Sequence, residues 1–314
     1  MNLRQLRIIH ETVRQNFNLT EVANELFTSQ SGISKHILDL ESELGVEIFV
    51  RKGRRLIGLS LAGTEILAIA ERMLLDSKNI KSLGKQYSDG DKGQLIIATT
   101  HTQALYALPK VVSQFKKRYP NVNLVIQQGS PKEIGQILQD GYADFGITSE
   151  SLDLIPELIT IPYYDWYHSI VVPKGHPLEK IHKISLQDLV DYPIVTYSEG
   201  ITGRRSIDEA FAKANITPHI VMAALDADVI KTYIELELGV GIISSVAFQP
   251  ERDSKLCFIN SEHLFNPNKT KIAIRKGYFL RGFAHDFVAL CSPQVDQELL
   301  QAALNSTLDV EFIN

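Results

Sequence analysis

Two short helical patterns lie close together between residues 19 and 45, and they constrain the fold more than any other stretch. The first pattern places apolar residues at helical spacing, at Leu19, Val22, Ala23 and Leu26. The second forms a single apolar stripe, at Ile33, Ile37, Leu40 and Leu44. A polar break at residues 28–31 separates them. This layout predicts a helix-turn-helix.

The second helix carries a polar face beside its apolar stripe. Ser29 can cap the helix through its hydroxyl, and Gly45 can end it in a left-handed conformation. In a helix-turn-helix, the first turns of the second helix enter the DNA major groove. We therefore expect base contacts from the hydrogen-bonding side chains near its start, which are Gln30, Ser31, Ser34 and Lys35.

A basic turn follows the second helix. Two short strand patterns, at residues 46–50 and 56–59, flank a glycine turn at Gly53. The turn holds four cations, Arg51, Lys52, Arg54 and Arg55. Directly after a helix-turn-helix, this pattern indicates the wing of a winged helix with its charges on DNA phosphates, where they release counterions. The alternative is a solvated basic hairpin without a ligand.

Residues 1–70 resemble the DNA-binding head of the LysR-type transcriptional regulators. The matching segments keep the family's order and spacing: Ser29-Gln30-Ser31-Gly32-Ile33-Ser34, Leu40-Glu41-Ser42-Glu43-Leu44-Gly45, Phe49-Val50-Arg51 and Leu59-Ser60-Leu61-Ala62-Gly63. Ser31 stands where many members carry proline. The resemblance implies a regulator of transcription rather than an enzyme, with double-stranded promoter DNA and RNA polymerase as partners.

Residues 61–87 predict one long helix. An imperfect heptad seam runs along it, through Ile66, Ala70, Met73, Ser77, Ile80, Gly84 and Tyr87. The seam favours pairing with a second copy; packing against the chain's own body is the alternative. The family resemblance implies a dimer through this helix and a homotetramer. We expect a DNA-binding domain at residues 1–60, a linker helix and hinge at 61–92, and an effector-binding domain at 93–314.

From residue 94 the pattern changes to alternating strands and helices. Such alternation favours a mostly parallel α/β sheet. We expect one half to comprise residues 94–162 and 269–290 and the other to comprise residues 167–263. The resemblance implies a two-subdomain effector domain similar to periplasmic binding proteins, with the ligand in the cleft. The fold class is thus multi-domain α+β: a winged helix-turn-helix, a long linker helix and an α/β effector domain.

The loops after the predicted strands are rich in hydroxyl groups. Residues 99–103 read Thr-Thr-His-Thr-Gln and lie between a buried strand and a helix start. Strand carboxyl ends hold ligands in open α/β sheets, and helix N-termini favour anions. These loop ends offer hydroxyls and amides with little fixed charge. They predict a small oxyanion or acylated amino acid held by hydrogen bonds; simple helix capping is the alternative.

The effector region resembles the cysteine-regulon branch of the family, the CysB- and Cbl-like regulators. The matching segments include residues 99–104, 128–131, 143–145, 193–197, 202–204, 226–233 and 238–241. The resemblance implies control of sulfur assimilation, with sulfate, acetylserine or adenosine phosphosulfate as ligand. By motif it implies an anion site at Thr100, Thr102, Gln103, Ser149 and Thr202. Glu199 would disfavour an anion unless it points outward or pairs with Arg204 or Arg205.

The remaining composition excludes several other functions. The two cysteines, Cys257 and Cys291, form no motif and are expected to be buried thiols. No metal-ligand spacing, nucleophile elbow or phosphate-binding glycine loop is present, so we expect no cofactor. Without a membrane-length apolar run or a signal peptide, we expect a cytoplasmic protein. Two alternatives remain: a LysR-type regulator of another pathway, and a ligand-binding or enzymatic domain with an appended DNA-binding head.

Overall fold

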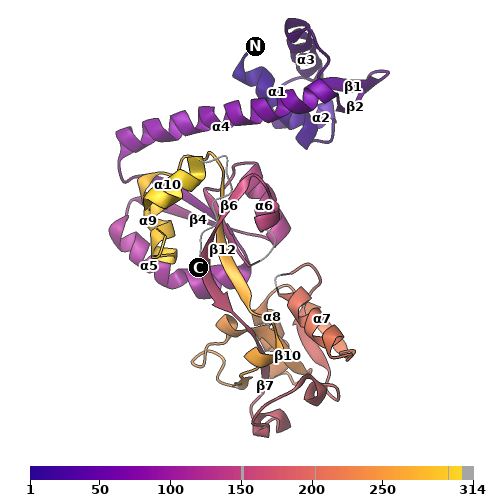
Figure 1. The fold of residues 1–314 in the computed structure, drawn as a ribbon, viewed down its shortest axis with the longest axis vertical. Coiled ribbons are helices and arrows are strands. Elements are labelled where there is room, and N and C mark those ends of the chain that lie inside the picture. Colours follow the sequence, from indigo (N-terminus) through magenta and orange to yellow (C-terminus); the bar gives the residue numbers. More distant parts are fainter. Residues whose placement is uncertain (150–151, 202, 296, 306–314) are drawn as a thin grey trace. The chain divides into compact units, whose positions relative to one another are not determined.

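The structure is a computed structural model that describes residues 1–149, 152–201, 203–295 and 297–305. The chain forms two compact units. The first comprises residues 1–85, and the second comprises the described residues from 86 onward (Figure 1).

The first unit begins with three helices: α1 (Leu3–Arg14), α2 (Leu19–Glu25) and α3 (Gln30–Leu44). The apolar stripes of all three meet in one core that includes Ile9, Val22 and Ile37. The Ser29 hydroxyl accepts a hydrogen bond from the backbone N–H of Gly32 at 3.1 Å, and Gly45 ends α3 with φ of 71°. The predicted helix-turn-helix is therefore confirmed.

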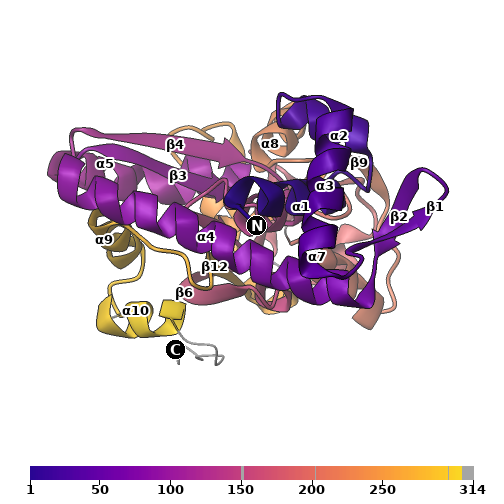
Figure 2. The ribbon, with the colours of Figure 1, turned by 90° about the horizontal axis from the view of Figure 1, so that it is seen from above.

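A two-stranded hairpin follows, formed by β1 (Phe49–Lys52) and β2 (Arg55–Leu59). Figure 2 shows the hairpin extending away from α1, α2 and α3. The buried carboxylate of Glu41 fixes its base, because it accepts the backbone N–H groups of Ile48 and Phe49 at 2.8 and 3.1 Å. The same carboxylate also accepts a hydrogen bond from the Arg51 guanidinium at 2.6 Å.

The long helix α4 (Leu61–Asp89) continues from the hairpin. Its Gly63 lies so close to the wing that an added Cβ would be 2.0 Å from the Ile48 carbonyl oxygen. Farther along, an apolar stripe is exposed on the helix, at Met73, Ile80, Leu83 and Tyr87. Neither α4 nor any other described helix is both long and apolar enough to cross a bilayer.

The second unit holds two five-stranded sheets. The first sheet has the order β4 (Val122–Gln128), β3 (Gly93–Thr99), β5 (Phe145–Thr148), β12 (Asn268–Arg275) and β6 (Leu158–Trp166). Its helices are α5 (Leu108–Arg118), α6 (Pro131–Gln139), α9 (Gly282–Cys291) and α10 (Gln297–Asn305). One core joins the sheet to α5, α9 and α10, and a separate core joins it to α6, so helices cover both of its faces (Figure 1).

The second sheet has the order β11 (Leu256–Ile259), β7 (His168–Pro173), β10 (Val240–Ser244), β8 (Ile194–Tyr197) and β9 (Ile220–Ala224). The helices α7 (Arg204–Lys213) and α8 (Ala227–Glu235) contribute Phe211 and Ile230 to its core. Cys257 on β11 is only partly buried, so the expectation of two buried thiols holds for Cys291 alone.

Strand directions in both sheets are more mixed than the predicted parallel arrangement. β3 pairs in parallel with β4 and β5, whereas β12 runs antiparallel to β5 and β6. The reason is that β6 and β12 carry the chain between the two sheets in opposite directions, pairing from Asn268↔Trp166 to Arg275↔Leu158. Only Tyr167 separates β6 from β7 in the other sheet. The predicted two-subdomain α/β architecture is confirmed; subdomain I holds the first sheet and subdomain II the second.

Candidate functional site

A cavity of about 520 Å³ lies between the two subdomains. Subdomain I contributes the loops after β3 and β4, and subdomain II contributes the ends of β8 and β10. The cavity is lined by Thr100, His101, Thr102, Gln103, Gln128, Gly129, Ser130, Pro131, Glu133, Trp166, Tyr197, Ile201, Leu225, Asp226 and Ser244. Its position at the carboxyl ends of strands is where open α/β sheets hold ligands.

The helix after β3 starts at the cavity with an unusual turn. Helical conformation begins at His101, passes through a π turn at Gln103–Ala107 and continues as α5. Such π turns occur frequently at functional sites. In the sequence, apolar residues at helical spacing are recognisable only from Leu105 onward. The structure instead places Thr100 and Thr102 at the start of the helix, against the cavity.

Two helices that begin beside the cavity, α6 and α8, already have side-chain caps at their N-termini, from Ser130 and Asp226. Glu133 accepts the backbone N–H and the hydroxyl of Ser130, both at 2.8 Å, and these bonds lower the pKa of Glu133. Asp226 accepts the N–H of Val229 at 2.9 Å and so caps α8. The π turn has no side-chain cap. The positive end of the helix after β3 is therefore open to an anion.

Gln103 and Ser149 belong to a hydrogen-bonded cluster beside the cavity. The buried Gln103 amide accepts from the Tyr164 hydroxyl at 2.5 Å and donates to the Thr270 hydroxyl at 3.4 Å. Ser149 bonds to the same Thr270 hydroxyl at 2.7 Å and accepts the indole N–H of Trp166 at 2.9 Å. Both predicted residues thus hold neighbouring side chains in place. Of the two, only Gln103 lines the cavity, and Thr202 lies outside the described residues.

The subdomain II wall consists of residues that the sequence analysis did not select. They are Tyr197, Ile201, Leu225, Asp226 and Ser244. Tyr197 and Ser244 are the last residues of β8 and β10. The rule that led to Thr100 could therefore have found them. Trp166, the last residue of β6 in subdomain I, also lines the cavity.

A chain of hydrogen bonds crosses between the subdomains near the cavity. The Tyr106 hydroxyl, from the π turn, donates to Asp228 at 2.6 Å, and Lys231 donates to Tyr106 at 2.9 Å and to Asp253 at 2.9 Å. Burial and the Asp228 carboxylate raise the pKa of Tyr106, so it stays a neutral donor. Partial burial opposes ionisation of Asp228, but bonds from Tyr106 and the Lys231 charge lower its pKa overall.

His101 joins the same network, with its ring nitrogens 3.3 Å from Gln128 and 3.3 Å from Asp228. Its ligand atoms and those of Asp226 and Asp228 all lie within 4.8 Å of one another. Asp226 caps α8, and Asp228 bonds to Tyr106 and Lys231. Protein donors, including the Lys231 ammonium group, therefore already engage both carboxylates.

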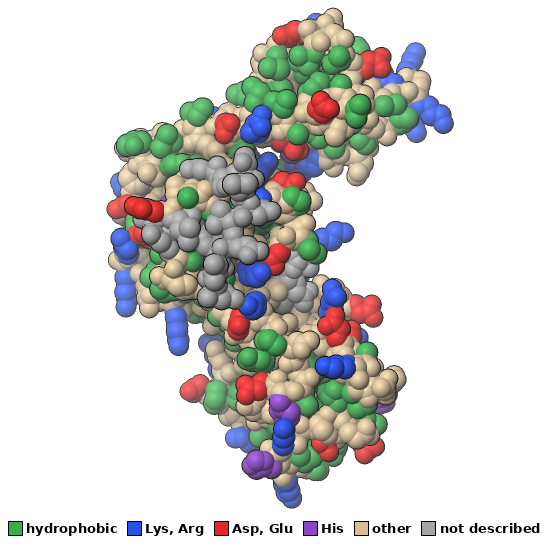
Figure 3. All heavy atoms as spheres, in the orientation of Figure 1, with side chains coloured by type: hydrophobic (Ala, Val, Ile, Leu, Met, Phe, Trp, Pro, Cys, Tyr) green, Lys and Arg blue, Asp and Glu red, His purple; other side chains and the backbone are tan. Residues whose placement is uncertain are grey.

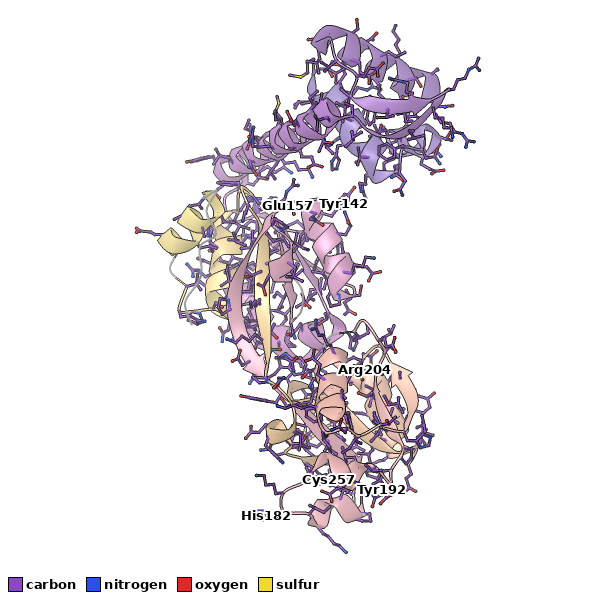
Figure 4. The ribbon with its side chains drawn as sticks, turned by 45° about the vertical axis from the view of Figure 1, so that its right-hand side comes forward. Tyr142, Glu157, His182, Tyr192, Arg204 and Cys257 are labelled. Atoms are coloured by element: carbon purple, nitrogen blue, oxygen red, sulfur yellow. The ribbon has the colours of Figure 1, made fainter. Side chains whose placement is uncertain are left out.

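Glu199 is exposed and does not line the cavity. Arg204, at the start of α7, donates to the Tyr197 carbonyl oxygen at 2.7 Å and to Asp208 at 2.8 Å (Figure 4). Arg205 pairs with Glu209 at 2.7 Å. Glu199 therefore does not oppose an anion in the cavity, where the lining carboxylates are Glu133 and Asp226.

In the first unit, the candidate DNA-binding residues lie on α3 and the wing. Gln30, Ser31 and Lys35 are exposed and Ser34 is half-buried. The hairpin carries the exposed cations Lys52, Arg54 and Arg55, and Figure 3 shows Lys and Arg side chains gathered at the end of this hairpin. Arg51 differs from them, because its guanidinium pairs with the buried Glu41. A groove of about 350 Å³ between α3 and the wing is lined by residues of both, including Gln30, Ser34 and Arg54.

Comparisons with known proteins agree with this architecture. Residues 3–64 match the family described as "Bacterial regulatory helix-turn-helix protein, lysR family". Residues 88–296 match "LysR substrate binding domain". The cofactor-binding domain of the Cbl transcriptional regulator, a solved structure, is 39% identical with a TM-score of 0.66, covering 68% of this chain and 95% of its own.

Full-length relatives carry names of transcriptional regulators. The HTH-type transcriptional regulator SsuR of Burkholderia cenocepacia is 48% identical, over 98% of this chain and 100% of its own length. The HTH-type transcriptional regulator cbl of Escherichia coli is 45% identical over 99% of both chains. The prediction of a regulator rather than an enzyme is confirmed by these matches. The chain belongs to the LysR family of transcriptional regulators and is similar over its full length to SsuR, CysB and Cbl.

Proposed function

We propose that this LysR-type regulator controls genes of sulfur assimilation and cysteine synthesis, and that a small sulfur oxyanion or acylated amino acid in the cavity is its signal. The observation that carries the ligand proposal is the helix start beside Thr100 and Thr102, which has no side-chain cap, whereas the N-termini of α6 and α8 are capped by Ser130 and Asp226. Sulfate, acetylserine and adenosine phosphosulfate fit this donor set, because each offers acceptor oxygens to hydroxyls and amides.

The proposed DNA contacts divide into two groups. Gln30, Ser31, Ser34 and Lys35 contact base edges from α3. The wing cations contact phosphates, which position the head without specifying sequence. Residues 1–60 contain eight Lys or Arg and seven Asp or Glu, so the head is nearly neutral. Phosphate binding is therefore concentrated at the wing, and each head contributes modest non-specific affinity.

The proposed assembly is a homo-oligomer formed through α4. The exposed apolar stripe of that helix supports a second copy as its partner. Ligand binding shifts the arrangement of heads on DNA, and it can do so only by its differential affinity for two arrangements of the effector subdomains. Promoter binding places this activity with the chromosome in the cytoplasm, and RNA polymerase is the partner through which transcription changes.

Thermal unfolding of the full-length protein tests the ligand proposal. Sulfate, thiosulfate, acetylserine and adenosine phosphosulfate are titrated beside chloride and phosphate. A ligand at about 100 times its Kd stabilises the folded state by roughly 2.7 kcal/mol. We expect a saturable rise in Tm with one of the sulfur compounds, and we expect Thr100→Ala and Thr102→Ala to lose it.

Thr217→Ala is the matched control, because Thr217 is an exposed threonine outside the cavity lining. This variant should keep the full ligand response. If none of the sulfur compounds raises Tm, the sulfur signal is wrong, and the assignment to the LysR family stands without it.

A further inference from the structure

The cavity contains a second polar position on the wall opposite the Thr100 loop. Ser244 is 2% exposed and lines the cavity, and its hydroxyl is one of the buried side-chain groups that have no hydrogen-bond partner among the described residues. Buried hydroxyls in native proteins nearly always have a partner. A hydroxyl without a partner at a cavity wall is available to a polar group of a molecule bound in the cavity.

Neighbouring side chains fix Ser244 in place. Its backbone N–H donates to the Tyr197 hydroxyl oxygen at 2.9 Å, and Tyr197 also lines the cavity. Burial raises the pKa of Tyr197, so this hydroxyl is neutral. In the sheet, Ser244 pairs with the fully buried His168. The wall is thus rigid, polar and uncharged at this position.

The rest of the lining limits what can reach Ser244. No described lining residue is a lysine or arginine, and the ionisable groups besides His101 and Tyr197 are the carboxylates Glu133 and Asp226. A second anionic group on the ligand would therefore lack a cationic partner. Trp166 and Ile201 offer apolar surface between the polar positions. At about 520 Å³ the cavity falls in the range of sites for small organic molecules and is larger than a lone tetrahedral ion requires.

We propose that the cavity binds a bifunctional ligand, with an oxyanion at Thr100 and Thr102 and a neutral hydroxyl, carbonyl or amide group at Ser244, joined by a short body against Trp166. This inference rests on the proposed oxyanion site and adds the chemical class of the rest of the molecule. Inorganic sulfate occupies only one of the two positions.

Calorimetric titration of the full-length protein with paired sulfonates tests the inference. Alkanesulfonates of two to four carbons are compared with the same chains carrying a terminal hydroxyl, beside inorganic sulfate. One good hydrogen bond corresponds to a preference of about tenfold. We expect that preference for the hydroxylated member in at least one pair. In Ser244→Ala it should vanish while sulfate affinity is unchanged, and Thr100→Ala should weaken all compounds.

The melting temperature of ligand-free Ser244→Ala gives a second, independent readout. The hydroxyl has no described partner, so its removal should leave Tm unchanged or raise it. A clear fall in Tm would show that the hydroxyl is already bonded in the free protein and would overturn the inference.

The binding results distinguish a failure of the Ser244 position from a failure of the oxyanion site at Thr100 and Thr102. If plain and hydroxylated sulfonates bind equally at every length, the Ser244 position is wrong and the oxyanion site stands. If neither sulfate nor any sulfonate binds, the oxyanion site itself fails and the bifunctional ligand fails with it.

Discussion

The Tyr106 hydroxyl of subdomain I donates to the Asp228 carboxylate of subdomain II at 2.6 Å. Lys231 supports this contact, since its ammonium group bonds to Tyr106 at 2.9 Å while it is also held by Asp253. This phenol therefore links the two subdomains, together with His101, whose ring nitrogen lies 3.3 Å from the same carboxylate. Any movement of one subdomain against the other must break or stretch this bond.

Tyr106→Phe should loosen the contact between the subdomains. The phenyl ring remains, but the hydrogen bond to Asp228 is lost, at a cost of about 1–3 kcal/mol for a bond to a charged group. Urea unfolding of the full-length protein, followed in the transition of the effector unit, measures the change. Tyr233→Phe is the control, because Tyr233 is an exposed tyrosine on α8, and it should change the free energy of unfolding little. Equal stabilities for the two variants would contradict the role of Tyr106.

Arg51 and its basic neighbours should respond differently to alanine substitution. Arg54→Ala and Arg55→Ala each remove a cation that we assign to a phosphate, so the slope of log K against log salt should fall by about 0.9 per contact. Arg51→Ala removes the partner of the buried Glu41. It should therefore lower the stability of the head by about 1–3 kcal/mol.

Fluorescence anisotropy with a labelled duplex over a range of salt concentrations measures the slopes, and circular dichroism melting measures stability. Lys35→Ala serves as a further comparison, because Lys35 is assigned to base contact; it should weaken specific binding more than binding to random duplex. If Arg51→Ala leaves the melting of the head unchanged, the structural role of Arg51 is wrong.

His168 should make the protein less stable in mild acid. Burial lowers the pKa of this fully buried side chain from 6.5 to about 3. Below pH 6.5 the unfolded chain binds a proton that the folded chain does not, so the free energy of unfolding falls as pH decreases toward about 3. The slope from one such group approaches about 1.4 kcal/mol per pH unit.

His168→Gln removes this titration and keeps a polar side chain of similar length. The variant should show a shallower dependence of unfolding free energy on pH between 6.5 and 5. His285, whose pKa burial also lowers, remains in both proteins, so the difference between them isolates His168. Parallel pH profiles would show that His168 does not stay neutral in the folded state.

Substitutions on the exposed stripe of α4 should disrupt self-association. Ile80→Glu places a carboxylate on the apolar face and keeps a good helix former. If a second copy covers this face, burying the charge strongly disfavours the complex. Sedimentation velocity should show smaller species for Ile80→Glu, whereas Lys81→Glu, at the next and exposed position, should keep the wild-type distribution.

Local patterns predicted the parts of the fold that are held by local contacts. The stripe of Ile33 and Ile37, the cap at Ser29 and the left-handed Gly45 all lie within one helix, and all are confirmed. The antiparallel pairing of β6 with β12 was not predicted, since it joins residues more than a hundred positions apart and no short-range periodicity encodes it.

In the candidate site too, local sequence patterns identify some residues and miss others. Thr100 and Thr102 follow a recognisable buried strand, and the structure places both at the cavity. Ser244 also ends a strand, so the same rule could have selected it, but the sequence does not show that it lines the same cavity as the threonine loop. The pairing of Arg51 with Glu41 was missed for a similar reason, because the four wing cations are indistinguishable by composition.

The chain has a single tryptophan, and that residue is Trp166, in the cavity wall with its indole N–H bonded to Ser149. Indole emission from the native protein therefore originates at one known position, with no background from other tryptophans. Occupation of the cavity changes the polarity around that ring directly. The fluorescence emission of Trp166 can therefore report ligand binding in the native protein, without a label or an engineered residue.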